Sequence, residues 1–142
     1  MIKYNIKKFQ ADITRINKIL PKKLREVKIN FVDYGTAQAL CAGGININFR
    51  GILELKELKE AFEIYLKKKL SLKAFFVLVY LHEAGHTYRH ITGQADYERN
   101  RRELYFFNED PDYIKRQLIY WNGITEEKEA WKFAKTYFKK GG

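Results

Sequence analysis

The sequence predicts a single α+β domain over residues 1–142, in which a small antiparallel sheet packs on a helical body. Two short segments alternate apolar and polar residues, as half-buried strands do. Several other segments repeat apolar residues every three or four positions, as helices do. The length of 142 residues and the hydrophobic content of 46% suit one ordinary core.

The N-terminal segment is predicted to form an amphipathic helix that reaches about Leu20 and stops before Pro21. Strands are expected at residues 27–32 (VKINFV) and 44–49 (GININF), because both alternate apolar and polar side chains. The connection between them is rich in turn residues and has room for a short strand, so the two strands are expected to pair as an antiparallel sheet. A further helix is expected from Leu55 onward, ending in the basic run Lys67–Lys69.

The longest helix is expected to begin at the apolar run Leu72–Leu81 and to continue to about Gly93, because glycine suits the position just past a helix end. Its first half is apolar nearly all round, so this helix should lie in the middle of the domain. Gly85 lies inside it, where glycine costs about 1 kcal/mol relative to alanine. The simplest reason for that glycine is the close approach of another backbone.

Residues 94–123 are predicted to form two more helices, with Asp110 as the N-cap and Pro111 as the first residue of the second one. The dipeptide Asn-Gly at 122–123 is a turn signal. A last helix is therefore expected from Ile124 to Phe138.

Residues 82–86 read His-Glu-Ala-Gly-His, which is an HExxH motif. Positions i and i+4 of a helix lie one turn apart on the same face, so His82 and His86 can bind one Zn²⁺ ion. Glu83 points slightly off that axis, so it can hold a zinc-bound water and take its proton as the water attacks a carbonyl. A structural zinc site or a packed pair of helix histidines is the alternative interpretation of the same residues.

A catalytic zinc ion usually has three protein ligands, so the two histidines need a partner. His90 lies a further turn along the helix, out of reach of a metal that the first two histidines hold. Asp96 and Glu98 could approach only if the chain reverses at Gly93. The carboxylates of the last helix are better candidates.

Helical phase separates three glutamates of the last helix. Glu127 falls inside its apolar stripe, Glu126 on the edge of the stripe, and Glu129 points away from it. A carboxylate on an apolar face is costly unless it is paired or binds a metal, so Glu127 needs either zinc or a buried salt bridge. The stripe consists of Ala130, Trp131, Ala134, Tyr137 and Phe138.

The HEAGH motif is followed downstream by the pattern E-x-x-A-x-x-F-A, which reads EKEAWKFA at residues 127–134. Together the two motifs resemble those of the gluzincin zinc peptidases, and most closely those of the ImmA/IrrE type, which are small intracellular proteins. The resemblance extends over about residues 28–139. The chain is more distantly similar to minimal archaeal gluzincins and to SprT-like proteins.

The resemblance implies a gluzincin-like fold in which the HExxH helix and a later helix together form the site. It implies His82, His86 and Glu127 as ligands of Zn²⁺ and Glu83 as the general base. The chain departs from the family pattern at Trp131, where an aspartate that contacts a ligand histidine is usual. The stretch between the two motifs is also longer than is usual in the family.

The expected activity is that of a zinc-dependent metalloendopeptidase, which hydrolyses peptide bonds of a protein or peptide substrate such as a regulatory protein. One alternative is a latent peptidase whose cleft is blocked by its own residues 94–123. Another is a non-proteolytic protein that keeps the zinc fold and binds nucleic acid or a protein partner through its basic surface. The reaction needs a hydrogen-bond donor for the oxyanion, and the eligible tyrosines are Tyr88, Tyr97, Tyr105, Tyr113 and Tyr120.

The amino-acid composition predicts the kind of partner and the cellular compartment of the protein. The 27 Lys and Arg residues against 17 Asp and Glu residues give a formal net charge of +10, which favours acidic partners. These basic residues are scattered along the chain without a known nucleic-acid-binding motif, so nucleic acid is only a minor expectation. The sequence shows neither a signal peptide nor an apolar run long enough to span a membrane, so we expect a cytoplasmic protein that does not contact membranes. The single cysteine, Cys41, excludes an intrachain disulfide.

Overall fold

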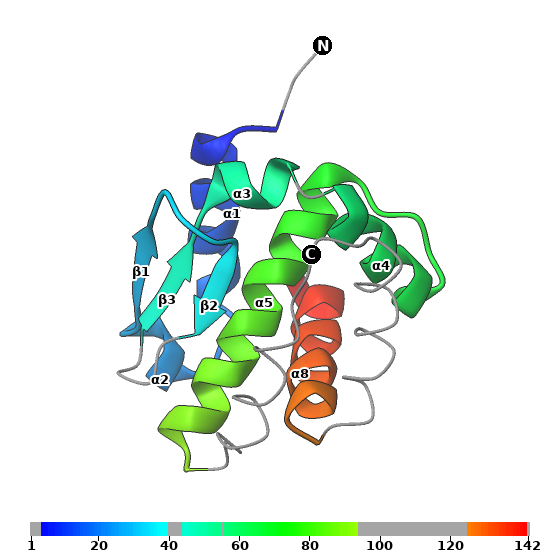
Figure 1. Cartoon of the computed structure of the whole chain (residues 1–142). Helices are drawn as coiled ribbons and strands as arrows, with labels where there is room; N and C mark the ends of the chain where they lie inside the picture. The colour runs from blue at the N-terminus through cyan, green and yellow to red at the C-terminus, as the bar shows by residue number, and fades with distance from the viewer. Residues whose placement is uncertain (1–3, 40–43, 55, 94–124, 142) are drawn as a thin grey trace.

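The computed structural model describes residues 4–39, 44–54, 56–93 and 125–141. In these ranges the chain forms a three-stranded sheet beside a body of helices (Figure 1). The expected mixed α+β class is therefore confirmed. Inside the helices, the backbone alone is described for residues 56, 57, 61, 65 and 125–127.

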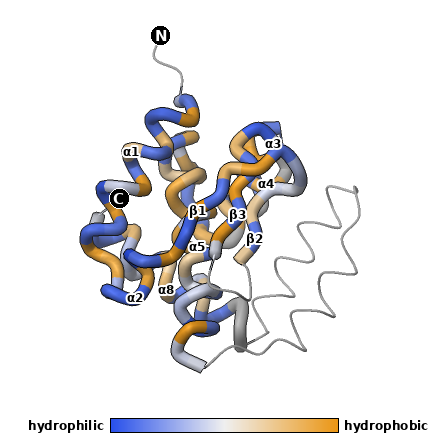
Figure 2. The backbone as a smooth tube through the Cα atoms, turned by 90° about the vertical axis from the view of Figure 1, so that its left-hand side faces the viewer, coloured by the Kyte–Doolittle hydropathy of each residue, from blue (hydrophilic) through white to orange (hydrophobic). Residues whose placement is uncertain are grey.

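Helix α1 (Ile6–Asn17) begins at Asn5, whose side chain accepts a hydrogen bond from the backbone N–H of Lys8. Hydrophilic and hydrophobic residues follow each other along this helix (Figure 2), as its amphipathic sequence predicts. It ends before the expected Leu20, and the short helix α2 (Lys22–Arg25) follows. The side chains that α1 buries are Phe9, Ile13 and Ile16.

The sheet consists of β1 (Lys28–Phe31), β2 (Ala37–Ala39) and β3 (Gly44–Ile47), in the order β1-β3-β2. Strand β3 pairs antiparallel with β2 but parallel with β1, where Lys28 lies opposite Gly44. The predicted antiparallel pairing of the first and last strands is therefore wrong. The chain reverses once to enter β2 and again to enter β3, so β3 runs in the same direction as β1.

Two helices follow the sheet, where the sequence predicted one. Helix α3 (Phe49–Glu54) precedes α4 (Lys56–Leu66), which ends just before the basic run Lys67–Lys69 that was expected to close it. Lys67 has a positive φ of 55°, the left-handed conformation common just past a helix end.

Helix α5 (Leu72–Ile91) is the central element, and its 20 residues match the predicted length. Ser71 caps its start by accepting a hydrogen bond from the Ala74 backbone N–H over 3.1 Å. Gly93 follows its end with a φ of 74°, as expected for glycine past a helix terminus. The helix contacts α1, α2, the sheet and α8 (Thr125–Gly141), so it forms the axis of the domain.

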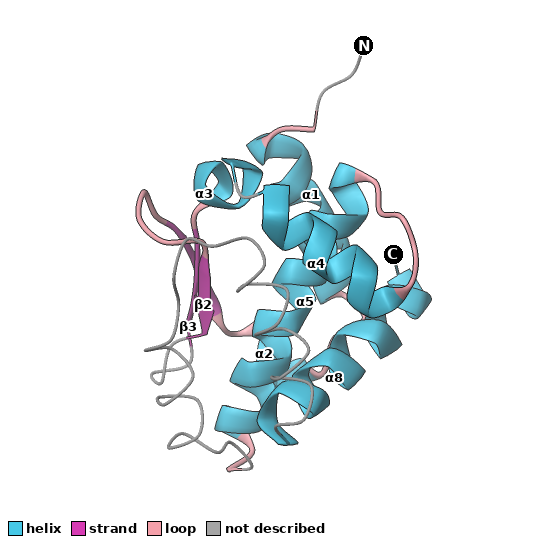
Figure 3. Ribbon diagram, turned by 45° about the vertical axis from the view of Figure 1, so that its right-hand side comes forward, coloured by secondary structure: helices cyan, strands magenta, loops and turns pink. Residues whose placement is uncertain are grey.

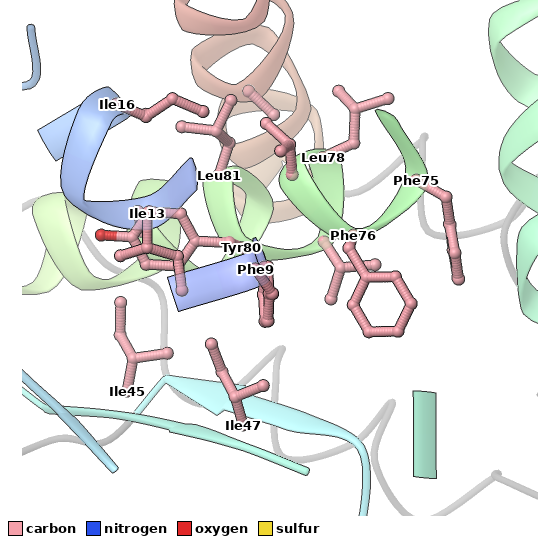
Figure 4. Close-up of a cluster of buried hydrophobic side chains, with 14 of the residues drawn as sticks. Phe9, Ile13, Ile16, Ile45, Ile47, Phe75, Phe76, Leu78, Tyr80 and Leu81 are labelled. Carbon is pink, nitrogen blue, oxygen red and sulfur yellow. The ribbon is translucent and has the colours of Figure 1, made fainter. Parts of the chain in front are cut away.

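The main core lies between α1, the sheet and the first half of α5 (Figure 4). Side chains from these three elements point toward one another, among them Phe9, Ile47 and Phe76. At the edge of this cluster the Tyr80 hydroxyl donates a hydrogen bond to the side-chain oxygen of Asn17. None of the helices within the described ranges combines the length and the apolar character that a membrane span requires.

Candidate metal centre

The HEAGH motif lies in the second half of α5, directly after the segment Phe75–Leu81. Every residue of that segment is buried, with at most 4% of its surface exposed. The motif therefore continues a helix that the core holds on all sides. Such a platform fixes the positions of side chains better than a loop would.

The two histidines of the motif converge on one point. Nε2 of His82 lies 3.2 Å from Nε2 of His86, and the two rings are nearly perpendicular, with an interplanar angle of 87°. The Nδ1 atoms on the other side of both rings are buried. The two Nε2 atoms thus form one edge of a possible coordination shell.

This separation can be compared with what zinc requires. A Zn²⁺ ion about 2.05 Å from both nitrogens would see them at an angle of about 100°, close to the tetrahedral value. An N–H···N hydrogen bond between neutral imidazoles has a similar length, so it is the metal-free interpretation of the same contact. The geometry fits a zinc ion. A measurement of the metal content of the purified protein would distinguish zinc binding from the hydrogen bond between the imidazoles.

Glu83 follows His82 directly and is half-buried. It follows His82 by about 100° around the helix axis. A carboxylate can accept a proton from a water molecule. This is the role of general base that the sequence predicts for Glu83.

The crossing of α5 and α8 occurs at Gly85. A Cβ atom on this residue would lie 3.1 Å from both the Cα and the carbonyl oxygen of Ala130, and 3.2 Å from Cβ of Phe133. The predicted close approach of another backbone is therefore confirmed, and the backbone is that of α8. Ala130 and Ala134 are fully buried, which confirms the predicted apolar stripe of α8.

Trp131 lies against the first histidine. The centroid of its ring system is 4.6 Å from that of His82, with an interplanar angle of 51°. Only 1% of its surface is exposed. The sequence predicted that Trp131 lies on the apolar stripe, but it did not assign this residue to the site. The available signal was its position in the family pattern, where an aspartate that contacts a ligand histidine is usual.

The other predicted ligands are not brought to the histidines by any described contact. Glu127 and Glu126 lie in the first turn of α8, where the side chains are outside the described residues. His90 lies one turn beyond His86 on α5 and is half-buried. Within the described part of the chain, no group of three metal-binding side chains occurs. Predicted residues outside the described ranges are Cys41, Asp96, Glu98, Asp110, Pro111 and the tyrosines 97, 105, 113 and 120.

A shallow hollow of about 270 Å³ opens between α5 and α8. Tyr88, the described member of the eligible tyrosines, lines this hollow, and its ring packs 5.6 Å from that of Phe133. Glu129 also lines it. The hollow is further lined by Arg89, Lys132, Thr136 and Tyr137.

Comparison of the chain with protein-family models, with curated proteins and with solved structures found no match.

Proposed function

We propose that this protein is a zinc-dependent metalloendopeptidase of gluzincin type. The observation that carries the proposal is the 3.2 Å separation of the His82 and His86 Nε2 atoms on a buried helix. A single ion can bridge two nitrogens at that distance with nearly tetrahedral geometry.

Glu127 is the proposed third ligand. It lies one helical turn before Trp131, and Trp131 contacts His82. Glu127 therefore lies on the same face of α8 as the residue that packs against the first histidine. The far end of α8 packs near the end of α1, where a Cβ on Gly141 would meet Ile19, just past that helix, and Ile16 within it.

The chemistry follows from the positions of the side chains. A bound zinc ion would supply a Lewis acid that polarises a peptide carbonyl and acidifies a water molecule. Glu83 would accept the proton of the attacking water and pass it to the leaving amine. A metal held by His82 and His86 would bind through Nε2 atoms that carry no proton.

The sheet offers a way to hold an extended substrate. Strand β2 is an edge strand that contacts α5, and one of its sides pairs with β3 (Figures 1 and 3). A peptide could add to its other side by backbone hydrogen bonds, which is a common mode of peptide recognition. This favours a protein or peptide substrate in extended conformation, such as a segment of a regulatory protein.

The proposal is tested by metal analysis combined with cleavage of a peptide library. The wild type should bind about one zinc ion per chain and cleave peptides, whereas His82→Ala should bind little zinc. Glu83→Gln should retain zinc and lose at least about a hundredfold in kcat/KM, because only the base is removed. Glu54→Gln is the matched control, since its exposed side chain on α3 should leave both properties unchanged. A wild type that binds no zinc would refute the proposal.

The runner-up is a non-proteolytic protein that binds a polyanion such as nucleic acid. Its support is the exposed face of α8, where Lys128, Lys132, Lys135 and Lys139 follow one another at helical spacing. A cationic stripe of this kind attracts phosphates, and its affinity falls steeply with salt. Zinc-loaded protein that cleaves no peptide but binds single-stranded DNA, and loses that binding on replacement of these lysines by glutamine, would favour this reading.

A further inference from the structure

We propose that Trp131 is a positioning residue, which fixes the imidazole of His82 by aromatic packing in the orientation that metal binding needs. The inference rests on the proposed function, because the ring orientation matters only if His82 binds a metal. It concerns a position at which a hydrogen-bonding carboxylate was expected from the family pattern.

The contact itself has the geometry of a specific aromatic pair. The centroids of the His82 and Trp131 rings are 4.6 Å apart and the rings are tilted by 51°. Aromatic rings at such separations prefer defined relative orientations, so the indole limits rotation of the imidazole. The His82 ring also meets the ring of His86 at nearly a right angle, with centroids 4.8 Å apart.

Trp131 is itself held from a third helix. Phe62 of α4 packs edge-on against Trp131 at 4.6 Å, and the same Phe62 packs edge-on against Phe75 of α5 at 5.4 Å. Phe62 and Phe75 are almost completely buried. A chain of rings therefore links the first turn of α5 to the histidine pair through α4 and α8, and its members cannot rotate independently.

The physical consequence concerns preorganisation. A histidine ligand is usually oriented by a hydrogen bond from its second nitrogen, and loss of that partner costs about 10- to 100-fold in metal affinity. Packing against the indole of Trp131 would limit rotation of the imidazole through shape, in addition to any hydrogen bond that the ring makes. Replacing it by a small side chain should let the His82 ring rotate away from His86 before metal arrives.

The first experiment measures Zn²⁺ affinity by competition with a chromophoric chelator. Trp131→Ala should bind Zn²⁺ about tenfold more weakly than the wild type, whereas Trp131→Phe should stay within about threefold because an aromatic plane remains. Phe62→Leu should give an intermediate loss. Phe9→Leu is the matched control, because it alters an equally buried ring in the core with α1 and should leave the affinity unchanged.

The second experiment reads the contact directly and does not depend on activity. Trp121→Phe leaves Trp131 as the one tryptophan of the chain. Co²⁺ bound between His82 and His86 should then quench most of its fluorescence, since the indole touches a ligand ring, whereas Zn²⁺ has no absorption that could quench it. His82→Ala in this background should abolish the quenching.

The outcomes separate the two proposals. A wild type without metal affinity overturns the peptidase proposal and this inference with it. A wild type that binds zinc, while Trp131→Ala binds it equally well, overturns this inference alone. The same holds if Trp131→Phe is as weak as Trp131→Ala, or if Co²⁺ leaves the Trp131 fluorescence unchanged. If Trp131→Ala does not fold, the phenylalanine variant and the quenching decide.

Discussion

At the scale of single residues, Gly85 determines how closely α5 and α8 can approach each other. A glycine within a buried helix had to be explained, and the backbone of Ala130 explains it. The contact between His82 and Trp131, in contrast, was not predicted. Helical phase placed Trp131 on a buried face, but the ring that it touches depends on how two helices cross, and local periodicity does not contain that information.

Gly85→Ala should destabilise the protein although alanine is the better helix former. Alanine would gain about 1 kcal/mol of helix propensity, whereas forcing a methyl group against the α8 backbone at 3.1 Å costs about 1–3 kcal/mol or more. We expect a lower denaturation midpoint in urea and weaker zinc binding.

A double variant distinguishes this cause from a simple side-chain clash. The close contacts are to the Cα and carbonyl oxygen of Ala130, which every residue has at that position. Ala130→Gly should therefore fail to rescue Gly85→Ala, and the two losses should at least add. Rescue would show that the helices meet through side chains instead.

At the scale of elements, helices were predicted better than the sheet. The ends of α5 follow from Ser71 and Gly93, which act locally, and Gly93 was predicted as the end of the helix. Strand direction is not a local property. The sequence predicted the turn-rich connection after β1. Because the chain reverses direction twice between β1 and β3 instead of once, these two strands run parallel.

The junction between α4 and α5 gives a prediction of how the stability of the protein depends on pH. The Glu63 carboxylate accepts hydrogen bonds from the Leu70 backbone N–H at 2.8 Å and from Lys59 Nζ at 3.2 Å. These bonds, the first above all, hold the pKa of Glu63 below its ordinary value. A lowered pKa in the folded state stabilises the protein above the ordinary pKa of glutamate, and this contribution is lost as pH falls through the folded-state value.

Glu63→Gln should accordingly lower the melting temperature at pH 7, and the difference from the wild type should shrink toward zero as pH is lowered to about 3. Melting curves followed by circular dichroism between these pH values measure it. Glu54→Gln, at an exposed position of α3, should show no such pH dependence. A difference that grows on acidification would contradict the assigned direction of the pKa.

At the scale of the whole molecule, the candidate site joins segments that are distant in sequence. The histidines belong to α5, and the proposed third ligand belongs to α8, beyond the residues that separate the two motifs. The sequence could name the members of this site from two motifs. Gly85 predicted the close approach of another backbone, but the residue that it meets, Ala130, depends on how two helices distant in sequence cross, and local sequence signals do not contain that information.

Zinc should therefore stabilise the fold as a whole. A ligand that binds only the native state at about 100 times its Kd adds about 2.7 kcal/mol to the free energy of unfolding. We expect Zn²⁺ to raise the melting temperature of the wild type and to raise that of Glu127→Ala much less. Mg²⁺, which prefers oxygen ligands, is the control that should have no effect. Equal stabilisation of Glu127→Ala would place the third ligand elsewhere.

The crossing at Gly85 also bears on the order in which the molecule is made. Residues 4–93 supply α1, the sheet and α5 before α8 leaves the ribosome. The histidine pair is therefore synthesised before α8, which packs against it. Contacts between residues that are distant in sequence form late in folding. The burial of Trp131 beside His82 should thus be among the last events of refolding, and metal captured earlier would be held by the two histidines alone.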